Sequence, residues 1–167
     1  MDFIKTWIKR FFASLFFTGY IPFGPGTIGS LITVATIFYF KDTLTPFFAL
    51  ANVQTFWFSY LLLLIAAIAL SNNAKAVFGK DDPGQITIDE VAGQIITFFL
   101  IPLNWKTILL GFVLFRFFDI VKPYPINKFE ELDGGLGIVM DDVVAGVMAN
   151  LSLVAILTLY SYMKTFI

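Results

Sequence analysis

Long apolar runs constrain the fold of this chain more than any other feature of its sequence. They cover residues 28–40, 44–70, 91–103, 107–121 and 138–163, and they predict helices. Only 44–70 and the uncharged stretch 143–163 reach the roughly 20 residues that a helix needs to cross a bilayer. Because 58% of the residues are hydrophobic and 14% are charged, one core of this size cannot hide them all from water. The sequence therefore predicts an all-α fold, a small polytopic membrane helical bundle with residues 1–167 as one embedded domain. A soluble all-α protein with an apolar face is the alternative.

The N-terminal segment 3–17 carries apolar residues at helical spacing: Ile4, Trp7, Ile8, Phe11, Phe12 and Leu15. Lys5, Lys9 and Ser14 fall mostly on the other side. This pattern predicts an amphipathic helix that lies at the membrane interface. We expect the helix to end near Gly19, because the stretch 21–27 is too rich in Pro and Gly to continue it.

Basic residues near the ends of the apolar runs predict the orientation of the chain. With five crossings and a cytoplasmic N-terminus, eight Lys and Arg residues fall inside and three outside, the bias that cytoplasmic loops usually have. The same assignment brings segments 19–27, 71–90 and 116–142 to one face, and these segments hold most of the unusual polar residues. The short runs 91–103 and 107–121 leave open a re-entrant pair, which would reduce the number of crossings to three.

The charge and residue inventory exclude several kinds of function. A net charge of −1 offers no field for binding a polyanion, so nucleic acid is not an expected partner. The chain has no Cys and no His, which removes thiolate nucleophiles, imidazole bases and the usual ligands of zinc or copper. Any chemistry must use carboxylates, Lys, Arg, hydroxyl groups or a hard metal ion.

Two acidic pairs precede apolar runs in similar sequence contexts. Asp89 and Glu90 stand before run 91–103, and Asp141 and Asp142 stand before 143–163. The simpler interpretation is that acids near a helix start complement its dipole, which contributes about 0.3 to 1 kcal/mol each. The small residues Ala92, Gly93, Ala145 and Gly146 would let the two helices approach closely. Four carboxylates would then meet and repel one another, and their oxygen atoms suit magnesium, manganese or calcium.

Arg116, Asp119 and Lys122 recur at every third residue, so they share one face of a helix that Pro123 ends. One interpretation is an intrahelical series of ion pairs, which contributes only a few tenths of a kcal/mol per pair. The other is a phosphate site, in which Arg116 supplies a planar fork and Lys122 a point charge.

Two glycine-rich segments are interpreted as turns that open helices. In Gly24-Pro-Gly-Thr-Ile-Gly-Ser30, Thr27 is the candidate N-cap, and the backbone N–H groups of such a start can bind phosphate. Leu132-Asp-Gly-Gly-Leu-Gly137 leads to the helix expected to begin with Asp141 and Asp142, and it either cradles an anion or only turns the chain.

Four segments together resemble the phosphatidylglycerophosphatase A family of bacterial membrane lipid phosphatases. They are 24–31, 82–93, 115–126 and 134–146, in the order of the family's motifs. The resemblance implies magnesium-dependent removal of the terminal phosphate from phosphatidylglycerol phosphate, the last step in making phosphatidylglycerol. It also implies a multi-pass protein of the bacterial inner membrane whose active site faces the cytoplasm. Some members have His where Pro83 stands here, so the family's chemistry does not need that histidine.

The motif positions suggest a role for each candidate residue. The resemblance and the residue chemistry together assign Mg²⁺ binding to Asp82, Asp89, Glu90, Asp141 and Asp142, and phosphate binding to Thr27, Arg116 and Lys122. The expected catalytic set is Asp89, Glu90, Arg116, Asp119, Lys122, Asp141 and Asp142, and Asp119 is a further candidate metal ligand. Attack by water and attack by an Asp both remain open.

Two other functions share features with this sequence. A CDP-alcohol-type phospholipid transferase is also small and rich in Asp, but its acids recur within one extended motif that is absent here. An ion-coupled transporter would spread its charges through the membrane depth, whereas these charges collect at one face.

Overall fold

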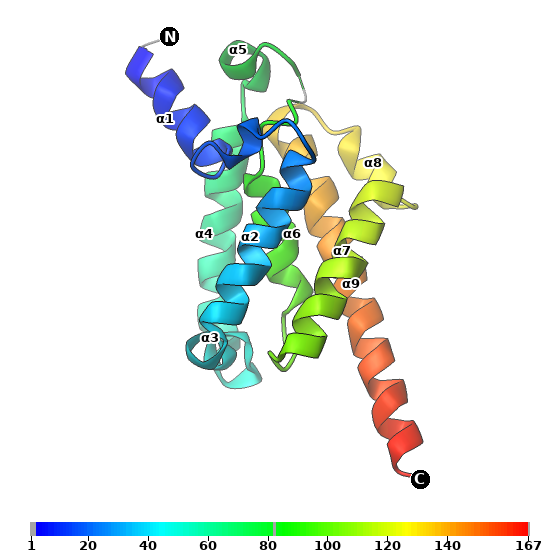
Figure 1. Cartoon of the computed structure of the whole chain (residues 1–167). Coiled ribbons are helices and arrows are strands. Elements are labelled where there is room, and N and C mark those ends of the chain that lie inside the picture. Colours follow the sequence, from blue (N-terminus) through cyan, green and yellow to red (C-terminus); the bar gives the residue numbers. More distant parts are fainter. Residues whose placement is uncertain (1–2, 82, 167) are drawn as a thin grey trace.

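The computed structural model describes residues 3–81 and 83–166, and within this part of the chain all regular structure is helical. Helices α2 (Pro25–Tyr39), α4 (Val53–Ser71), α6 (Ile88–Thr97), α7 (Trp105–Val121) and α9 (Gly134–Lys164) run between the two ends of a bundle (Figure 1). Helices α1 (Phe3–Ala13), α5 (Ala74–Phe78) and α8 (Ile126–Glu130) lie at one end, and α3 (Lys41–Phe48) lies at the other. Two short 3-10 turns, η1 (Thr18–Tyr20) and η2 (Leu50–Asn52), complete the set. The predicted all-α class is confirmed.

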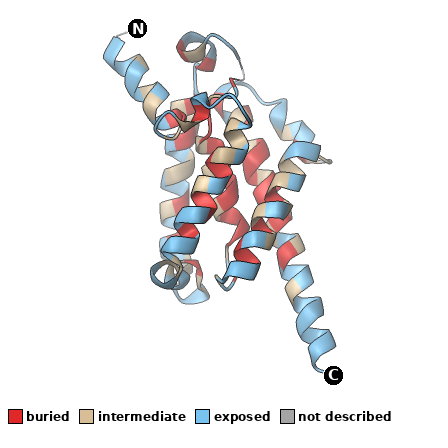
Figure 2. Cartoon of the chain, in the orientation of Figure 1, coloured by how far each residue is buried: buried red, intermediate tan, exposed pale blue. Residues whose placement is uncertain are grey.

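Among the residues that the structure describes, two helical segments are long and apolar enough to cross a bilayer by length and composition. They are Leu50–Ser71 and α9, with mean hydropathies of 2.0 and 2.1. Only 17% and 28% of their most apolar windows are buried inside the protein, so they do not resemble the buried core helices of a soluble domain. Exposed residues line the outer faces of the bundle and the part of α9 that extends beyond it (Figure 2). This distribution suits lipid as the surrounding solvent.

The sequence predicts one helix over the apolar run 44–70, but the structure divides this run. Ala49 is extended, with ψ of 154°, and it separates α3 from η2 and α4. The side-chain amide of Asn52 donates to the carbonyl of Pro46 at 2.8 Å, which closes the turn between them. Helix α3 therefore lies across the end of the bundle, and the segment long enough to cross a bilayer begins at Leu50.

The run 91–103 also differs from expectation, because α6 ends at Thr97 and the chain continues without helical structure to Asn104. The side chain of Asn150 on α9 donates to the carbonyls of Thr97 and Phe99, at 2.9 and 2.8 Å, which satisfies groups that the helix end leaves free. The N–H of Leu100 donates to the carbonyl of Phe48, so this loop reaches the level of α3. The chain therefore crosses the full depth of the bundle here.

Helix α1 is shorter than the predicted segment 3–17, because the backbone turns at Leu15, Phe16 and Phe17, which all have positive φ. Lys9 donates to the carbonyls of Ala69 and Asn72 at the end of α4, where a cation also complements the helix dipole. The large apolar residues of α1 face outward, among them Phe3, Ile4, Trp7, Ile8 and Phe12. This division of faces agrees with the amphipathic helix that the sequence predicts.

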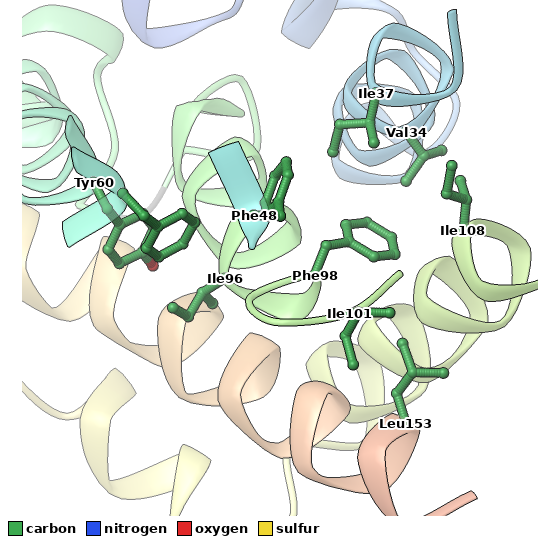
Figure 3. Close-up of a cluster of buried hydrophobic side chains, with 10 residues drawn as sticks. Val34, Ile37, Phe48, Tyr60, Ile96, Phe98, Ile101, Ile108 and Leu153 are labelled. Carbon is green, nitrogen blue, oxygen red and sulfur yellow. The ribbon is translucent and has the colours of Figure 1, made fainter. Parts of the chain in front are cut away.

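The apolar core lies in the part of the bundle near α3. Figure 3 shows Val34 and Ile37 from α2, Phe48 from α3, Ile108 from α7 and Leu153 from α9 around the buried Phe98. Because six helices and the loop after α6 contribute side chains to this cluster, it fixes their positions relative to one another.

Helices α6 and α9 touch through glycine, as the small residues in their sequences predict. Ala92, Gly93, Ala145 and Gly146 are all buried. A Cβ atom on Gly146 would overlap the carbonyl oxygen of Gly93 and lie 2.6 Å from a methyl group of Ile96. The backbones therefore meet at a distance that only glycine permits.

We expect Gly146→Ala to lower the free energy of unfolding by about 1 to 3 kcal/mol, because the new methyl group has no space and the helices must separate. Thermal unfolding in detergent measures the change. Val147→Ala, at the neighbouring exposed position, is the control and should unfold close to the unaltered chain. Equal unfolding temperatures for Gly146→Ala and the control would contradict the close packing.

Candidate active site

A cavity of about 900 Å³ opens at the end of the bundle that carries α5 and α8. It is lined by the first turns of α2 and α6, the last turns of α7, the first half of α9 and the loops beside them. Every described candidate residue from the sequence analysis lines it: Thr27, Asp89, Glu90, Arg116, Asp119, Lys122, Asp141 and Asp142. Asp82, the remaining candidate, lies outside the described residues. Segments far apart in the sequence thus supply one site.

The two acidic pairs occupy different places in their helices. Asp89 and Glu90 stand in the first turn of α6, where the simple dipole interpretation applies to them. Helix α9 begins at Gly134, earlier than expected, so Asp141 and Asp142 lie about two turns inside it. The expectation that these two acids begin a helix is therefore wrong, and a capping role does not explain them.

Three carboxylates from three helices come close together. Single oxygen atoms of Glu90 on α6, Asp119 on α7 and Asp142 on α9 all lie within 4.8 Å of one another. Glu90 and Asp142 are buried and Asp119 is partly buried. Oxygen donors at this spacing are chemically suited to a hard divalent cation, which would also relieve their mutual repulsion.

The other two acids lie beside this group but are not part of it. One carboxylate oxygen of Asp89 accepts a hydrogen bond from the backbone N–H of Glu90 at 2.9 Å. Asp141 accepts from the N–H of Asp142 in the same way, also at 2.9 Å. The sequence predicts metal binding from both pairs, whereas the geometry combines one member of each pair with Asp119.

Arg116 bridges two members of the acidic group. Its NH1 nitrogen lies 2.5 Å from Glu90 Oε2 and 2.9 Å from Asp119 Oδ2. Its Nε is buried and has no hydrogen-bond partner among the described residues. Of the proposed intrahelical ion pairs only Arg116–Asp119 forms, because Lys122 turns to other helices. One donor of the guanidinium is thus left unsatisfied inside the protein.

Lys122 ends α7 in a left-handed conformation, with φ of 44°. Its Nζ lies 2.8 Å from Asp141 Oδ2 and 2.9 Å from Glu130 Oε1. Partial burial lowers the pKa of Lys122, but the hydrogen bonds to Asp141 and Glu130 outweigh it and raise the pKa above its usual range. The ammonium is therefore charged at neutral pH. It has three N–H donors, so one is left for a ligand.

The start of α2 differs from the expectation that Thr27 caps it. Gly24 is the N-cap, with φ of 56°, which glycine adopts readily, and Pro25 follows as the first helical residue. Thr27 instead stands exposed in the first turn and lines the cavity. The expected glycine-rich loop 132–137 is likewise partly helical, since α9 begins at Gly134 and the N–H of Gly135 donates to Asn72 Oδ1 at 3.0 Å.

Two residues at the site were not found by the sequence analysis. Ser30 is fully buried on α2, and its hydroxyl donates to Glu90 Oε2 at 2.8 Å. Glu130 at the end of α8 holds Lys122. Helical spacing from Gly26 could have indicated Ser30, had the helix been predicted to begin at Pro25. Nothing in the sequence around Glu130 indicates its partner.

Known proteins with similar sequences cover most of this chain. The profile of the family described as Phosphatidylglycerophosphatase A matches residues 11–157, a range that includes all the segments lining the cavity. Phosphatidylglycerophosphatase A of Haemophilus influenzae is 38% identical over 144 residues, which are 84% of this chain and 83% of the relative. The protein of the same name from Escherichia coli is 35% identical over 136 residues, 80% of this chain and 74% of the relative.

A third relative has a different name. A Bacteroides thetaiotaomicron protein, named provisionally as a phosphatidylinositol-3-phosphatase, is 38% identical over 135 residues, 79% of this chain and 82% of the relative. No solved structure matches the chain significantly. The names of all three relatives describe phosphatases of phospholipids that carry a phosphate monoester.

Proposed function

The chain belongs to the phosphatidylglycerophosphatase A family, and on that premise we propose that it hydrolyses the phosphate monoester of phosphatidylglycerol phosphate to give phosphatidylglycerol. The observation that carries this proposal is the cavity in which two cationic side chains, Arg116 and Lys122, stand beside the carboxylates of Glu90, Asp119 and Asp142. Cations can bind the phosphate oxygens, and carboxylates can hold the divalent ion that phosphoryl transfer commonly uses.

Arg116 and Lys122 approach the cavity from one end of α7, one turn and a half apart in sequence. The Arg116 guanidinium, whose side chain is partly exposed at the cavity, and the third N–H of Lys122 would bind non-bridging phosphate oxygens. Thr27, exposed on the cavity wall, adds a hydroxyl group and a backbone position near a helix start. These groups would orient the phosphate toward the carboxylates. Hydrolysis then breaks the ester bond between phosphorus and the alcohol oxygen, and water supplies a hydroxyl group to phosphorus and a proton to the alcohol.

Magnesium fits the carboxylate group in chemistry and in spacing. Glu90, Asp119 and Asp142 would hold it, with Asp89 and Asp141 next to them. Gly26 supports this assignment, because a Cβ there would occupy the place of Glu90 Oε1, so the glycine keeps that oxygen unobstructed. The ion would supply neutralisation of charge on the phosphate oxygens.

The substrate test measures inorganic phosphate released from phosphatidylglycerol phosphate in mixed micelles, with phosphatidylinositol 3-phosphate as the competing substrate that the Bacteroides relative suggests. We expect faster release from phosphatidylglycerol phosphate. Chelator should abolish release and magnesium should restore it, because the proposed ligands are oxygen atoms only. Full turnover in chelator would contradict the metal assignment, and a preference for the inositol lipid would contradict the substrate.

The role of Arg116 can be tested by keeping its charge and removing its planar guanidinium group. We expect Arg116→Lys to lose at least tenfold in activity, since lysine cannot reach Glu90, Asp119 and a phosphate oxygen together. Lys128→Arg is the control, because Lys128 pairs with the exposed Glu131 and does not line the cavity. An Arg116→Lys variant as active as this control would favour a purely structural ion pair.

The orientation proposal is that the cavity faces the cytoplasm, which rests on the excess of basic residues at that end of the bundle. Because the chain has no Cys, single cysteines can be introduced without background. We choose Asn127→Cys on α8 and Asp42→Cys on α3, both exposed and at opposite ends of the bundle. Asn104 is avoided because its side chain caps α7.

In right-side-out membrane vesicles, an impermeant maleimide should label the Asp42→Cys chain and spare the Asn127→Cys chain. Detergent should make both reactive. Labelling of Asn127→Cys from outside would refute a cytoplasmic cavity, and protection of both sites would refute a full crossing between them.

A further inference from the structure

We infer that Ser30 is a positioning residue, whose hydroxyl holds Glu90 so that one carboxylate oxygen stays available to a divalent cation. The inference rests on the metal part of the proposed function. Ser30 lies on α2 and is completely buried, and Glu90 lies on α6. Their contact therefore ties the second turn of α2 to the first turn of α6 beside the cavity.

The two oxygens of Glu90 have different surroundings. Oε2 accepts from Ser30 Oγ at 2.8 Å and from Arg116 NH1 at 2.5 Å, so its hydrogen-bonding capacity is used. Oε1 points toward Gly26, where a Cβ would overlap it. The contacts on Oε2 thus fix the carboxylate plane and leave Oε1 in the space that the missing side chain of Gly26 provides.

The Ser30 hydroxyl is suited to this role because it is itself oriented. Arg116 NH1 also lies 3.3 Å from Ser30 Oγ and can donate to it, which directs the hydroxyl proton away from the arginine. The proton can go to Glu90 Oε2 or to the carbonyl of Gly26, at 3.0 Å on the same helix. A buried hydrogen bond to a charged acceptor is the stronger of the two.

Helix α2 contains a matched comparison. Thr33, one turn after Ser30, is also buried, and its hydroxyl donates to the carbonyl of Gly29 at 2.9 Å, which is the ordinary contact of such a residue in a helix. Thr33 does not line the cavity. Removing its hydroxyl group therefore tests what the loss of a buried hydroxyl does to the helix alone.

The experiment measures Mn²⁺ binding to the detergent-solubilised chain by calorimetry, without substrate, for the unaltered chain, Ser30→Ala, Gly26→Ala and Thr33→Val. We expect Mn²⁺ binding about tenfold weaker in Ser30→Ala, the size of effect typical of groups that orient a metal ligand. Gly26→Ala should also bind more weakly, since its methyl group competes for the place of Oε1. Thr33→Val should bind as the unaltered chain does.

The activity assay gives a second readout. In Ser30→Ala the Mg²⁺ concentration for half-maximal activity should rise by a similar factor, with a smaller change in KM for the lipid. Unchanged Mn²⁺ affinity in Ser30→Ala, or an equal loss in Thr33→Val, would overturn the role of Ser30. Absence of Mn²⁺ binding by the unaltered chain would overturn both this inference and the metal part of the proposed function.

Discussion

Two positive charges hold together the acidic groups of four helices at one end of an apolar bundle. Arg116 joins α7 to Glu90 of α6, and Lys122 joins the end of α7 to Asp141 of α9 and Glu130 of α8. A buried charge without a partner is costly, so the positions of these helix ends depend on the ion pairs. Because the buried acids of the cavity outnumber its two interior cations, the pairs leave negative charge uncompensated. A divalent cation is the simplest ligand that would balance it.

The close contact between α6 and α9 brings the acidic residues of these two helices together. Gly93 and Gly146 let the two backbones touch, and Gly93 also lies against the carbonyl of Asp142. Glu90 stands one turn before Gly93 and Asp142 one turn before Gly146, so the same contact brings these two carboxylates side by side. Packing between small residues in the apolar part of the bundle thus determines the geometry of its polar end.

The sequence was sufficient to predict most of the residues that line the cavity, but not how they would pair. Spacing within one helix placed Arg116, Asp119 and Lys122 on a common face, and their presence in one cavity agrees with that. It could not tell that Arg116 would reach Glu90, or that Lys122 would turn to Glu130, because such contacts depend on which helices become neighbours. The predicted helix boundaries were wrong where tertiary contacts determine them. Asn52 closes the turn after α3, and α9 extends back through glycines to Gly134.

Helix α9 links the polar end of the bundle to its apolar surface. Asp141 and Asp142 are followed without interruption by the uncharged stretch 143–163, much of which is exposed. The carboxylates therefore lie where the helix changes from polar to lipid-like surroundings, and a rigid helix keeps that boundary at a fixed distance from the cavity. A phospholipid has the same division, with charge at its headgroup and hydrocarbon beyond it. A phosphate at this level would leave its acyl chains beside the apolar faces of the bundle, so the proposed reaction does not require the lipid to leave the bilayer.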